Sequence, residues 1–163
     1  MKIFLIRHAE AIDFETGSVS SDAYRFLTAK GRKVSRNVFR KLKDELANLE
    51  IVFTSPLIRA VQTAEILVNM VKFDSELELA NELATVSSAG DALKLVKKNS
   101  TFESMALVGH EPMMGMIVET ISGRNNPVFS FKKSGVCRID YDTKNDKWKF
   151  EWYYNPKTGE FIK

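Results

Sequence analysis

The chain has 163 residues, of which 44% are hydrophobic and 28% charged, and this length and composition predict a soluble globular protein with a core of its own. Its formal net charge of +3 could attract anions, but no run of lysine and arginine exceeds two residues, which argues against a nucleic-acid-binding protein. The single cysteine, Cys137, excludes an internal disulfide, and with only two histidines the chain has too few ligands for a zinc site.

Neither a targeting segment nor a membrane span is predicted. The first apolar stretch ends at Arg7, and no cleavage-site pattern follows it, unlike in a secretory signal peptide. No window approaches the ~18 apolar residues that a membrane-spanning helix requires. We therefore expect a cytoplasmic protein that uses no metal and no cofactor and has neither a nucleic-acid partner nor a membrane partner.

The first part of the chain predicts two buried strands separated by a loop and a helix. Residues 2–6 (KIFLI) and 51–54 (IVFT) are apolar without alternation, which is typical of strands that are buried on both faces. The polar segment 10–24 predicts a loop. Thr28 is placed to cap a helix over 29–48, in which apolar residues recur at helical spacing.

The rest of the chain continues the alternation of strands and helices and ends with two consecutive strands. The predicted elements are a helix from 56 or 57 to 71, a short strand near 75–79, a loop over 81–89, a helix over 90–98, a buried strand over 105–109, a helix over 112–122, and strands over 137–142 and 147–154. The last two strands flank a polar turn and predict an antiparallel hairpin. We therefore predict a single domain over 1–163: a three-layer α/β/α sandwich whose central sheet is mostly parallel, with the C-terminal hairpin at one edge.

Both histidines of the chain fall at the ends of predicted parallel strands. Arg7 and His8 end the first strand. Arg59 follows the second strand within the first turn of the next helix, and His110 follows the strand over 105–109. Ligands of open α/β sheets bind beyond the carboxyl ends of the strands. The sequence therefore predicts a site that joins two imidazoles with two guanidiniums.

That combination is suited to a phosphoryl group. Guanidinium groups match phosphate oxygens in geometry and stay charged, whereas an imidazole can act as a nucleophile or a hydrogen-bond donor near neutral pH. Arginines beside a histidine also lower its pKa, which keeps one ring nitrogen unprotonated. Taken singly, each histidine could equally be a packing or capping residue and each arginine a surface residue. Together they predict a phosphate site that needs no metal.

Four stretches form an ordered set of motifs: LIRHAEA (5–11), YRFLTAKG (24–31), TSPLIRAVQTAE (54–65) and LVGHEP (107–112). This set resembles the motifs of the histidine phosphatase superfamily, which are an R-H-G signature, R-x-L-T-x-x-G, S-P-x-x-R-A-x-Q-T and a segment with a second histidine. It looks most like the small SixA-type phosphohistidine phosphatases. The resemblance spans nearly the whole chain and implies a phosphoglycerate mutase-like fold.

The resemblance also implies a role for each matching residue. His8 would be the nucleophile, which becomes phosphorylated and is then freed by water. Arg7, Arg59 and His110 would bind the phosphoryl oxygens and stabilise the charge that develops on them. Arg25 matches an arginine near the pocket and would contact phosphate or substrate, unless it is simply a surface loop residue.

Two positions bear on how closely the chain follows the superfamily. Ala9 stands where glycine is commoner, and we expect its extra methyl group to be tolerated, as in SixA-like relatives. Ester-cleaving relatives use a carboxylate to protonate the leaving oxygen, and the position between the third and fourth of these motifs indicates Glu82. Alternatively, Glu82 is an ordinary surface residue and one of its neighbours takes that role: Glu76, Glu78 or Asp91.

Short loops favour a substrate that is displayed on another protein. Larger relatives cover the pocket with insertions, whereas only residues 13–24 and 81–89 could form a lid here. An open pocket admits a phosphorylated side chain, and phosphohistidine has a better leaving group than an alkyl ester. We therefore expect a metal-independent phosphatase that acts on phosphohistidine of a protein. The alternatives are a phosphatase of phosphate-bearing small molecules and a non-catalytic phosphate-binding module.

Overall fold

The computed structural model describes residues 1–72, 77–123 and 129–163. Its helices are α1 (Ala29–Lys41), α2 (Lys43–Leu46), α3 (Ile58–Val71), α4 (Ala89–Lys98) and α5 (Met113–Ser122). Its strands are β1 (Lys2–Arg7), β2 (Ile51–Thr54), β3 (Leu77–Leu79), β4 (Ser104–Gly109), β5 (Val136–Asp142), β6 (Lys147–Asn155) and β7 (Glu160–Ile162). None of the helices in these described ranges is long and apolar enough to cross a membrane.

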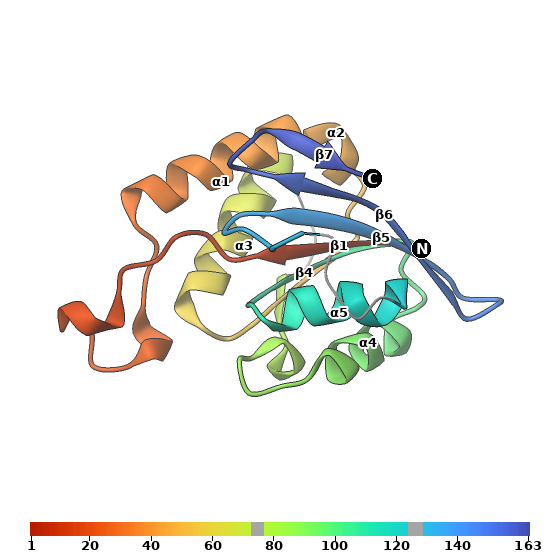
Figure 1. The fold of residues 1–163 in the computed structure, drawn as a ribbon, viewed down its shortest axis with the longest axis horizontal. Coiled ribbons are helices and arrows are strands. Elements are labelled where there is room, and N and C mark those ends of the chain that lie inside the picture. The colour runs from red at the N-terminus through yellow and green to blue at the C-terminus, as the bar shows by residue number, and fades with distance from the viewer. Residues whose placement is uncertain (73–76, 124–128) are drawn as a thin grey trace.

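The described strands form one mixed sheet in the order β3-β2-β4-β1-β5-β6-β7 (Figure 1). The strands β3, β2, β4 and β1 are parallel, and β5, β6 and β7 are antiparallel to their neighbours. The mostly parallel sheet and the C-terminal hairpin are thus confirmed. The hairpin does not itself form the edge, because β7 pairs with β6 beyond it. The sequence missed β7, since two of its three residues are exposed and carry no burial pattern.

A hydrophobic core on each face of the sheet explains why β1 is apolar throughout. Ile3 and Leu5 belong to the cluster that contains the buried residues of α4 and α5. Phe4 and Ile6 belong to the cluster that contains those of α1, α2 and α3. All four side chains are fully buried, and Figure 1 shows the two groups of helices on opposite faces of the sheet. The predicted three-layer α/β/α sandwich is confirmed.

The helix predicted over 29–48 is interrupted near its end. Thr28 caps α1 as predicted, since its hydroxyl oxygen accepts the N–H of Gly31 at 2.9 Å. At Leu42 the backbone leaves helical geometry, with a ψ of 13°, and α2 then continues for four residues. Leu42 and Leu46 are both buried, so the apolar face that the sequence predicted is kept across the break.

The start of α1 is fixed against the loop that follows β1. The Glu10 carbonyl oxygen accepts the N–H of Thr28 at 3.0 Å, and the Glu10 carboxylate accepts the Thr28 hydroxyl at 2.9 Å. A Cβ atom at Gly31 would overlap that same carbonyl oxygen. Glycine is therefore required where α1 approaches the loop.

Other boundaries differ from the prediction by one or two residues. The strand expected near 75–79 is observed as β3; Ser75 and the alternative acid Glu76 lie outside the described residues. Helix α4 begins one residue early because Ser88 and Asp91 form a reciprocal capping box. These shifts leave the order of elements, and hence the position of the predicted site, unchanged.

Candidate active site

His8 and His110 lie side by side at the carboxyl ends of two neighbouring parallel strands. The pairing of β1 with β4 sets Arg7 opposite Gly109, and the His8 N–H donates to the Gly109 carbonyl oxygen at 3.0 Å. The centroids of the two imidazole rings are 5.0 Å apart. His8 is 7% and His110 2% exposed. Two histidines far apart in the sequence thus form one buried pair at the rim of the sheet.

One hydrogen bond orients the His8 ring. Its Nδ1 atom lies 2.7 Å from the carbonyl oxygen of Ala9. Because a carbonyl oxygen can only accept, Nδ1 carries the proton and donates it, and the assignment of the proton follows from this contact. The neutral ring therefore keeps a free lone pair on Nε2.

The structure gives a physical reason why alanine fits at position 9. Ala9 is fully buried and packs in the core between the sheet and α1 and α3. Its N–H donates to Thr63 Oγ1 at 3.0 Å, and Thr63 in turn donates to the Arg59 carbonyl oxygen at 2.7 Å. Ala9 has no positive φ, so its backbone does not require glycine. The methyl group belongs to the core, and the loop after β1 is tied to α3.

A hydrogen bond to Ser55 holds the ring of the second histidine. His110 Nε2 lies 2.7 Å from Ser55 Oγ, and the same oxygen is 3.4 Å from the N–H of Leu57. A hydroxyl oxygen has one proton and two lone pairs, so Ser55 can accept from Leu57 and also either donate to or accept from Nε2. The sequence identified Ser55 only as the end of a strand. Its place four residues before Arg59 in the third motif was the available signal.

Burial keeps both imidazoles neutral. It is the largest cause that lowers the pKa of His8 to about 3, followed by the charge of His110, with Arg59 and Arg7 contributing less. Burial followed by the charge of Arg59 lowers the pKa of His110 to about 4. The sequence attributed such a shift to the arginines, but removal from water is the larger effect. An unprotonated Nε2 on His8 is thus available at neutral pH.

Acidification should destabilise the protein between about pH 6.5 and pH 4. Unfolded histidines take up protons below their ordinary pKa of about 6.5, whereas His8 and His110 remain neutral in the fold down to pKa values of about 3 and 4. The free energy of unfolding therefore falls as the pH falls, by about 1.4 kcal/mol per pH unit for each histidine. Urea unfolding at pH 7.0, 6.0 and 5.0 measures this slope. His8→Asn should remove part of it, and an unchanged slope in that variant would contradict the assignment.

Two arginines complete the site, and each is anchored on one side of its guanidinium. Arg7 Nη1 donates to the Phe131 carbonyl oxygen at 2.6 Å. Arg59, which lies in the first turn of α3 and is 4% exposed, donates from Nη1 and Nη2 to the Asp22 carbonyl oxygen and Oδ2 at 2.7 and 2.9 Å. The positive charges of both arginines act on both histidine rings.

Three buried side-chain nitrogens lack a hydrogen-bond partner within the described protein: Arg7 Nε, Arg59 Nε and His110 Nδ1. All three belong to the residues that the sequence selected for this rim. Buried polar groups are nearly always satisfied, so such atoms call for an explanation. An anion with several acceptor oxygens, such as a phosphoryl group, can accept from the two arginine nitrogens and, in the tautomer with its proton on Nδ1, from His110.

Arg25 reaches the site through Asp22. Arg25 Nε donates to the Ile12 carbonyl oxygen at 2.6 Å, and its Nη1 donates to Asp22 Oδ1 at 3.0 Å. Partial burial raises the pKa of Asp22, but hydrogen bonds from Arg25 and Arg59 outweigh it and hold that pKa below its ordinary value. The ionised Asp22 carboxylate thus bridges the two arginines. The sequence missed Asp22 because nothing local marks a pairing with a helix 37 positions away.

Glu82 and Glu111 take different positions relative to this group. Glu82 lies in the 3-10 turn Asn81–Leu83 and lines a surface hollow together with residues of α4. No hydrogen bond or ion pair within the described chain joins Glu82 to either histidine. Glu111 lines a hollow that includes Arg7, and burial raises the pKa of Glu111. The sequence missed Glu111, although it directly follows His110.

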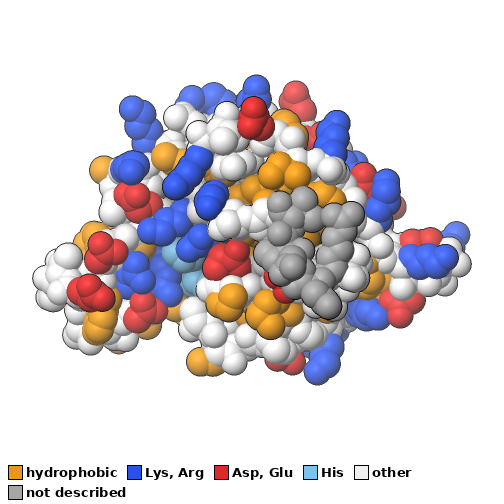
Figure 2. All heavy atoms as spheres, viewed as in Figure 1, with side chains coloured by type: hydrophobic (Ala, Val, Ile, Leu, Met, Phe, Trp, Pro, Cys, Tyr) orange, Lys and Arg blue, Asp and Glu red, His pale blue; other side chains and the backbone are white. Residues whose placement is uncertain are grey.

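The site opens onto a face that is rich in positive charge. Figure 2 shows histidine surface that other side chains leave uncovered, with lysine and arginine side chains around most of it and acidic side chains beside it. The loop between β1 and α1 extends away from the rest of the chain in Figure 1. Its residues Phe14 and Tyr24 are 46% and 55% exposed. This loop contributes Asp22 to the site, while its aromatic side chains face solvent.

Comparisons with known proteins agree with this geometry. Residues 3–87 match the family model described as "Histidine phosphatase superfamily (branch 1)". The chain is 28% identical over 159 residues to phosphohistidine phosphatase SixA of Escherichia coli K12, a match that covers 96% of this chain and 94% of that protein. A structure of the protein histidine phosphatase SixA complexed with tungstate superposes with a TM-score of 0.86 at 27% identity, covering 97% of this chain and 99% of that one. A likeness in fold alone extends to phosphoglycerate mutase of Bacillus anthracis, with a TM-score of 0.75 at 14% identity and coverage of 93% and 91%.

Proposed function

The chain belongs to the histidine phosphatase superfamily and is a phosphatase, and from that premise we propose that it hydrolyses phosphohistidine on a protein through a phosphorylated His8. One observation carries the proposal: the buried, neutral His8 ring presents Nε2 beside a second histidine and two arginines. The unpaired nitrogens of Arg7, Arg59 and His110 supply donors for three phosphoryl oxygens.

In the first step His8 displaces the substrate's imidazole. The lone pair on His8 Nε2 forms a bond to phosphorus while the phosphorus–nitrogen bond of the substrate breaks. The departing nitrogen keeps the bonding electrons, and because the other nitrogen of the substrate ring carries a proton, that ring leaves as neutral imidazole without a strong acid. The bond between Nδ1 and the Ala9 carbonyl oxygen at 2.7 Å stabilises the positive charge that His8 acquires as it is phosphorylated.

In the second step water attacks the phosphorus atom and the bond to Nε2 breaks. The electrons of that bond return to Nε2, one water proton passes to solvent, and inorganic phosphate leaves. Arg7, Arg59 and His110 serve both steps, because charge develops on the same phosphoryl oxygens each time. Donors held by protein contacts need no reorganisation as that charge develops, and this makes them effective in a site that excludes water.

Hydrolysis of phosphohistidine differs from hydrolysis of a phosphate ester because it does not need a general acid in the protein. An alkoxide must be protonated as it leaves, whereas an imidazole is a better leaving group. Glu82 remains the proposed acid for the alternative, a phosphatase of phosphate-bearing small molecules. Its position beside α4 does not itself favour that alternative. The uncovered histidine surface in Figure 2 supports a phosphorylated protein as the partner.

Replacing Glu82 by glutamine should leave the hydrolysis of a phosphohistidine peptide within about threefold of the wild-type rate, because neither step of the proposed mechanism uses a proton from Glu82. The measurement compares kcat/KM for a phosphohistidine peptide, an aryl phosphate and an alkyl phosphate in both proteins. Turnover of alkyl esters that depends strongly on Glu82, with none of phosphohistidine, would establish the small-molecule alternative instead. If no phosphorylated compound in the panel is turned over but phosphate still binds, the chain is a phosphate-binding module.

A further inference from the structure

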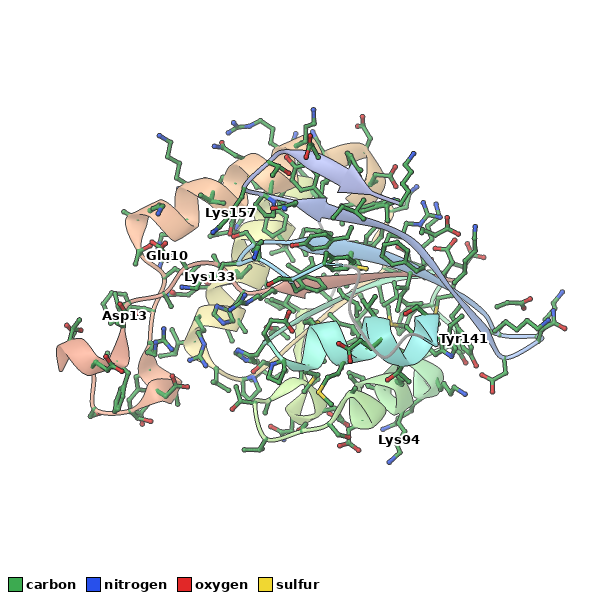
Figure 3. The ribbon with its side chains drawn as sticks, in the orientation of Figure 1. Glu10, Asp13, Lys94, Lys133, Tyr141 and Lys157 are labelled. Atoms are coloured by element: carbon green, nitrogen blue, oxygen red, sulfur yellow. The ribbon has the colours of Figure 1, made fainter. Side chains whose placement is uncertain are left out.

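A basic hollow lies beside the candidate active site. Its volume is about 400 Å³. Five cationic side chains and one carboxylate line it: Arg7, Lys30, Lys132, Lys133, Lys157 and Glu10. They come from the end of β1 and its loop, the start of α1, the turn before β5 and the turn after β6. Figure 3 shows Glu10, Lys133 and Lys157 near one another beside the start of α1. We call this site the lysine hollow.

Most of the positive charge in the lysine hollow is not neutralised by the protein. The Glu10 carboxylate is 3.4 Å from Lys30 Nζ and also accepts the Thr28 hydroxyl. Across the described part of the chain, the other four cations form no ion pair with a carboxylate. Like charges gathered in one hollow repel each other, and an anion from outside would relieve that repulsion.

The turn that presents two of the lysines is fixed to the backbone of the nucleophile. The N–H of Ser134 lies 3.3 Å from the His8 carbonyl oxygen. The Lys132 N–H donates to Tyr153 Oη at 2.7 Å, and the Lys132 carbonyl oxygen accepts the N–H of Gly135 at 2.8 Å. This positive surface therefore has a set position relative to His8. Arg7 lines the lysine hollow and also belongs to the candidate active site.

The way the cations are spread indicates the kind of anion. Lys133 and Lys157 are exposed, and the Lys30 side chain is 76% exposed. Lysine ammonium groups on flexible stems suit dispersed charges, whereas a single phosphate is held by converging, buried donors such as those of Arg59 and His110. Cations from four segments match several carboxylates along a polypeptide better than one compact anion.

We propose that the lysine hollow docks an acidic segment of the substrate protein, whose aspartate or glutamate side chains bind the lysines while the phosphohistidine reaches His8. The proposal rests on the proposed phosphohistidine phosphatase function and adds the sequence context of the substrate. Exposed charge pairs act mainly on encounter and retention of the partner. The lysine hollow therefore lowers KM for acidic substrates and leaves the chemical step unchanged.

The test uses two phosphohistidine peptides that differ only in their flanks, one acidic and one neutral, together with phosphoimidazole, which is too small to contact both sites. The variant Lys133→Ala/Lys157→Ala removes two lysines from the hollow. The control Lys144→Ala/Lys147→Ala removes the same charge at the β5–β6 turn, at the opposite end of the sheet. We expect the wild type and the control to prefer the acidic peptide about five- to tenfold in kcat/KM at low salt, through KM. In the hollow variant this preference should disappear.

Three outcomes would overturn the proposal: a preference that survives in the hollow variant, an equal loss of preference in the control, or an equal loss of phosphoimidazole turnover in the hollow variant. Tripolyphosphate that competes for the hollow when an acidic peptide does not would instead assign it to a compact polyanion. Failure of the proposed function itself gives a different result, since no phosphohistidine compound is then hydrolysed by the wild type. In that case binding of the unphosphorylated acidic peptide, measured by fluorescence anisotropy, still tests the docking.

Discussion

Replacing His8 by alanine should abolish the phosphoryl-enzyme and lower kcat by about 10⁴-fold or more, which is the order of loss when a nucleophile is removed from a catalytic unit. The hydrogen bond from His8 Nδ1 to Ala9 leaves the lone pair of His8 Nε2 free, whereas the His110 ring is held at Nε2 by Ser55 Oγ at 2.7 Å. Intact-protein mass spectrometry at neutral pH, after a pulse of phosphoimidazole, would detect an acid-labile phosphoryl group on the wild type and none on the variant.

The control for this result is His110→Ala, which removes a donor but leaves the nucleophile. That variant should still be phosphorylated on His8, more slowly than the wild type. A small cavity and the loss of one hydrogen bond to Ala9 are the only structural consequences expected of His8→Ala, so its thermal unfolding should remain cooperative. A phosphoryl group that persists in the His8→Ala protein, or that maps to His110 in the wild type, would exclude His8 as the nucleophile.

Replacing Arg59 by alanine should lower kcat for phosphohistidine by about 10²- to 10³-fold, the range observed when one preorganised donor to a developing charge is lost. Arg59 is 4% exposed, and its Nε atom is one of the three buried nitrogens without a partner. Its other nitrogens are held by Asp22 at 2.7 and 2.9 Å. Removing the side chain eliminates a buried positive charge that acts on both histidine rings.

Two further variants separate charge from geometry at this position. Arg59→Lys keeps a charge without the planar fork and should recover only part of the rate. Asp22→Asn keeps Arg59 but weakens its anchor, so it should lower kcat less than either Arg59 variant. If Arg59→Ala retains wild-type kcat while its fold is intact, Arg59 does not contact the phosphoryl group.

The neutrality of the two histidines follows from the same architecture that places them. Strands buried on both faces end at a rim where the following residues are still covered by protein, so His8 and His110 are 7% and 2% exposed. Removal from water disfavours the charged ring, and the mutual effect of the two rings and the arginines adds to it. The buried ends of the strands thus hold the two histidines in place and also keep their rings neutral, which is the protonation state that a nucleophile needs.

The sequence alone determined the order of the elements and the four side chains at the rim. Apolar runs such as residues 2–6 and 51–54 have one stable environment, the interior of a sheet that is covered on both faces. The carboxyl ends of parallel strands meet at one edge, so Arg7, His8 and His110 had to lie near one another. These inferences depend only on residues that are neighbours in the sequence and on the rule that parallel strands end at one edge of the sheet.

Only the tertiary structure decided what each of these groups touches. Asp22 bridges Arg25 and Arg59, Ser55 holds the ring of His110, and the lysine hollow gathers cations from four segments. Hydrogen bonds and charge clusters of this kind act over a few ångströms in space but join residues tens of positions apart, so no local pattern encodes them. The protonation state of the two histidines likewise depends on the tertiary structure. The sequence predicted that both lie at a phosphate site, but their neutrality results from burial by the whole fold.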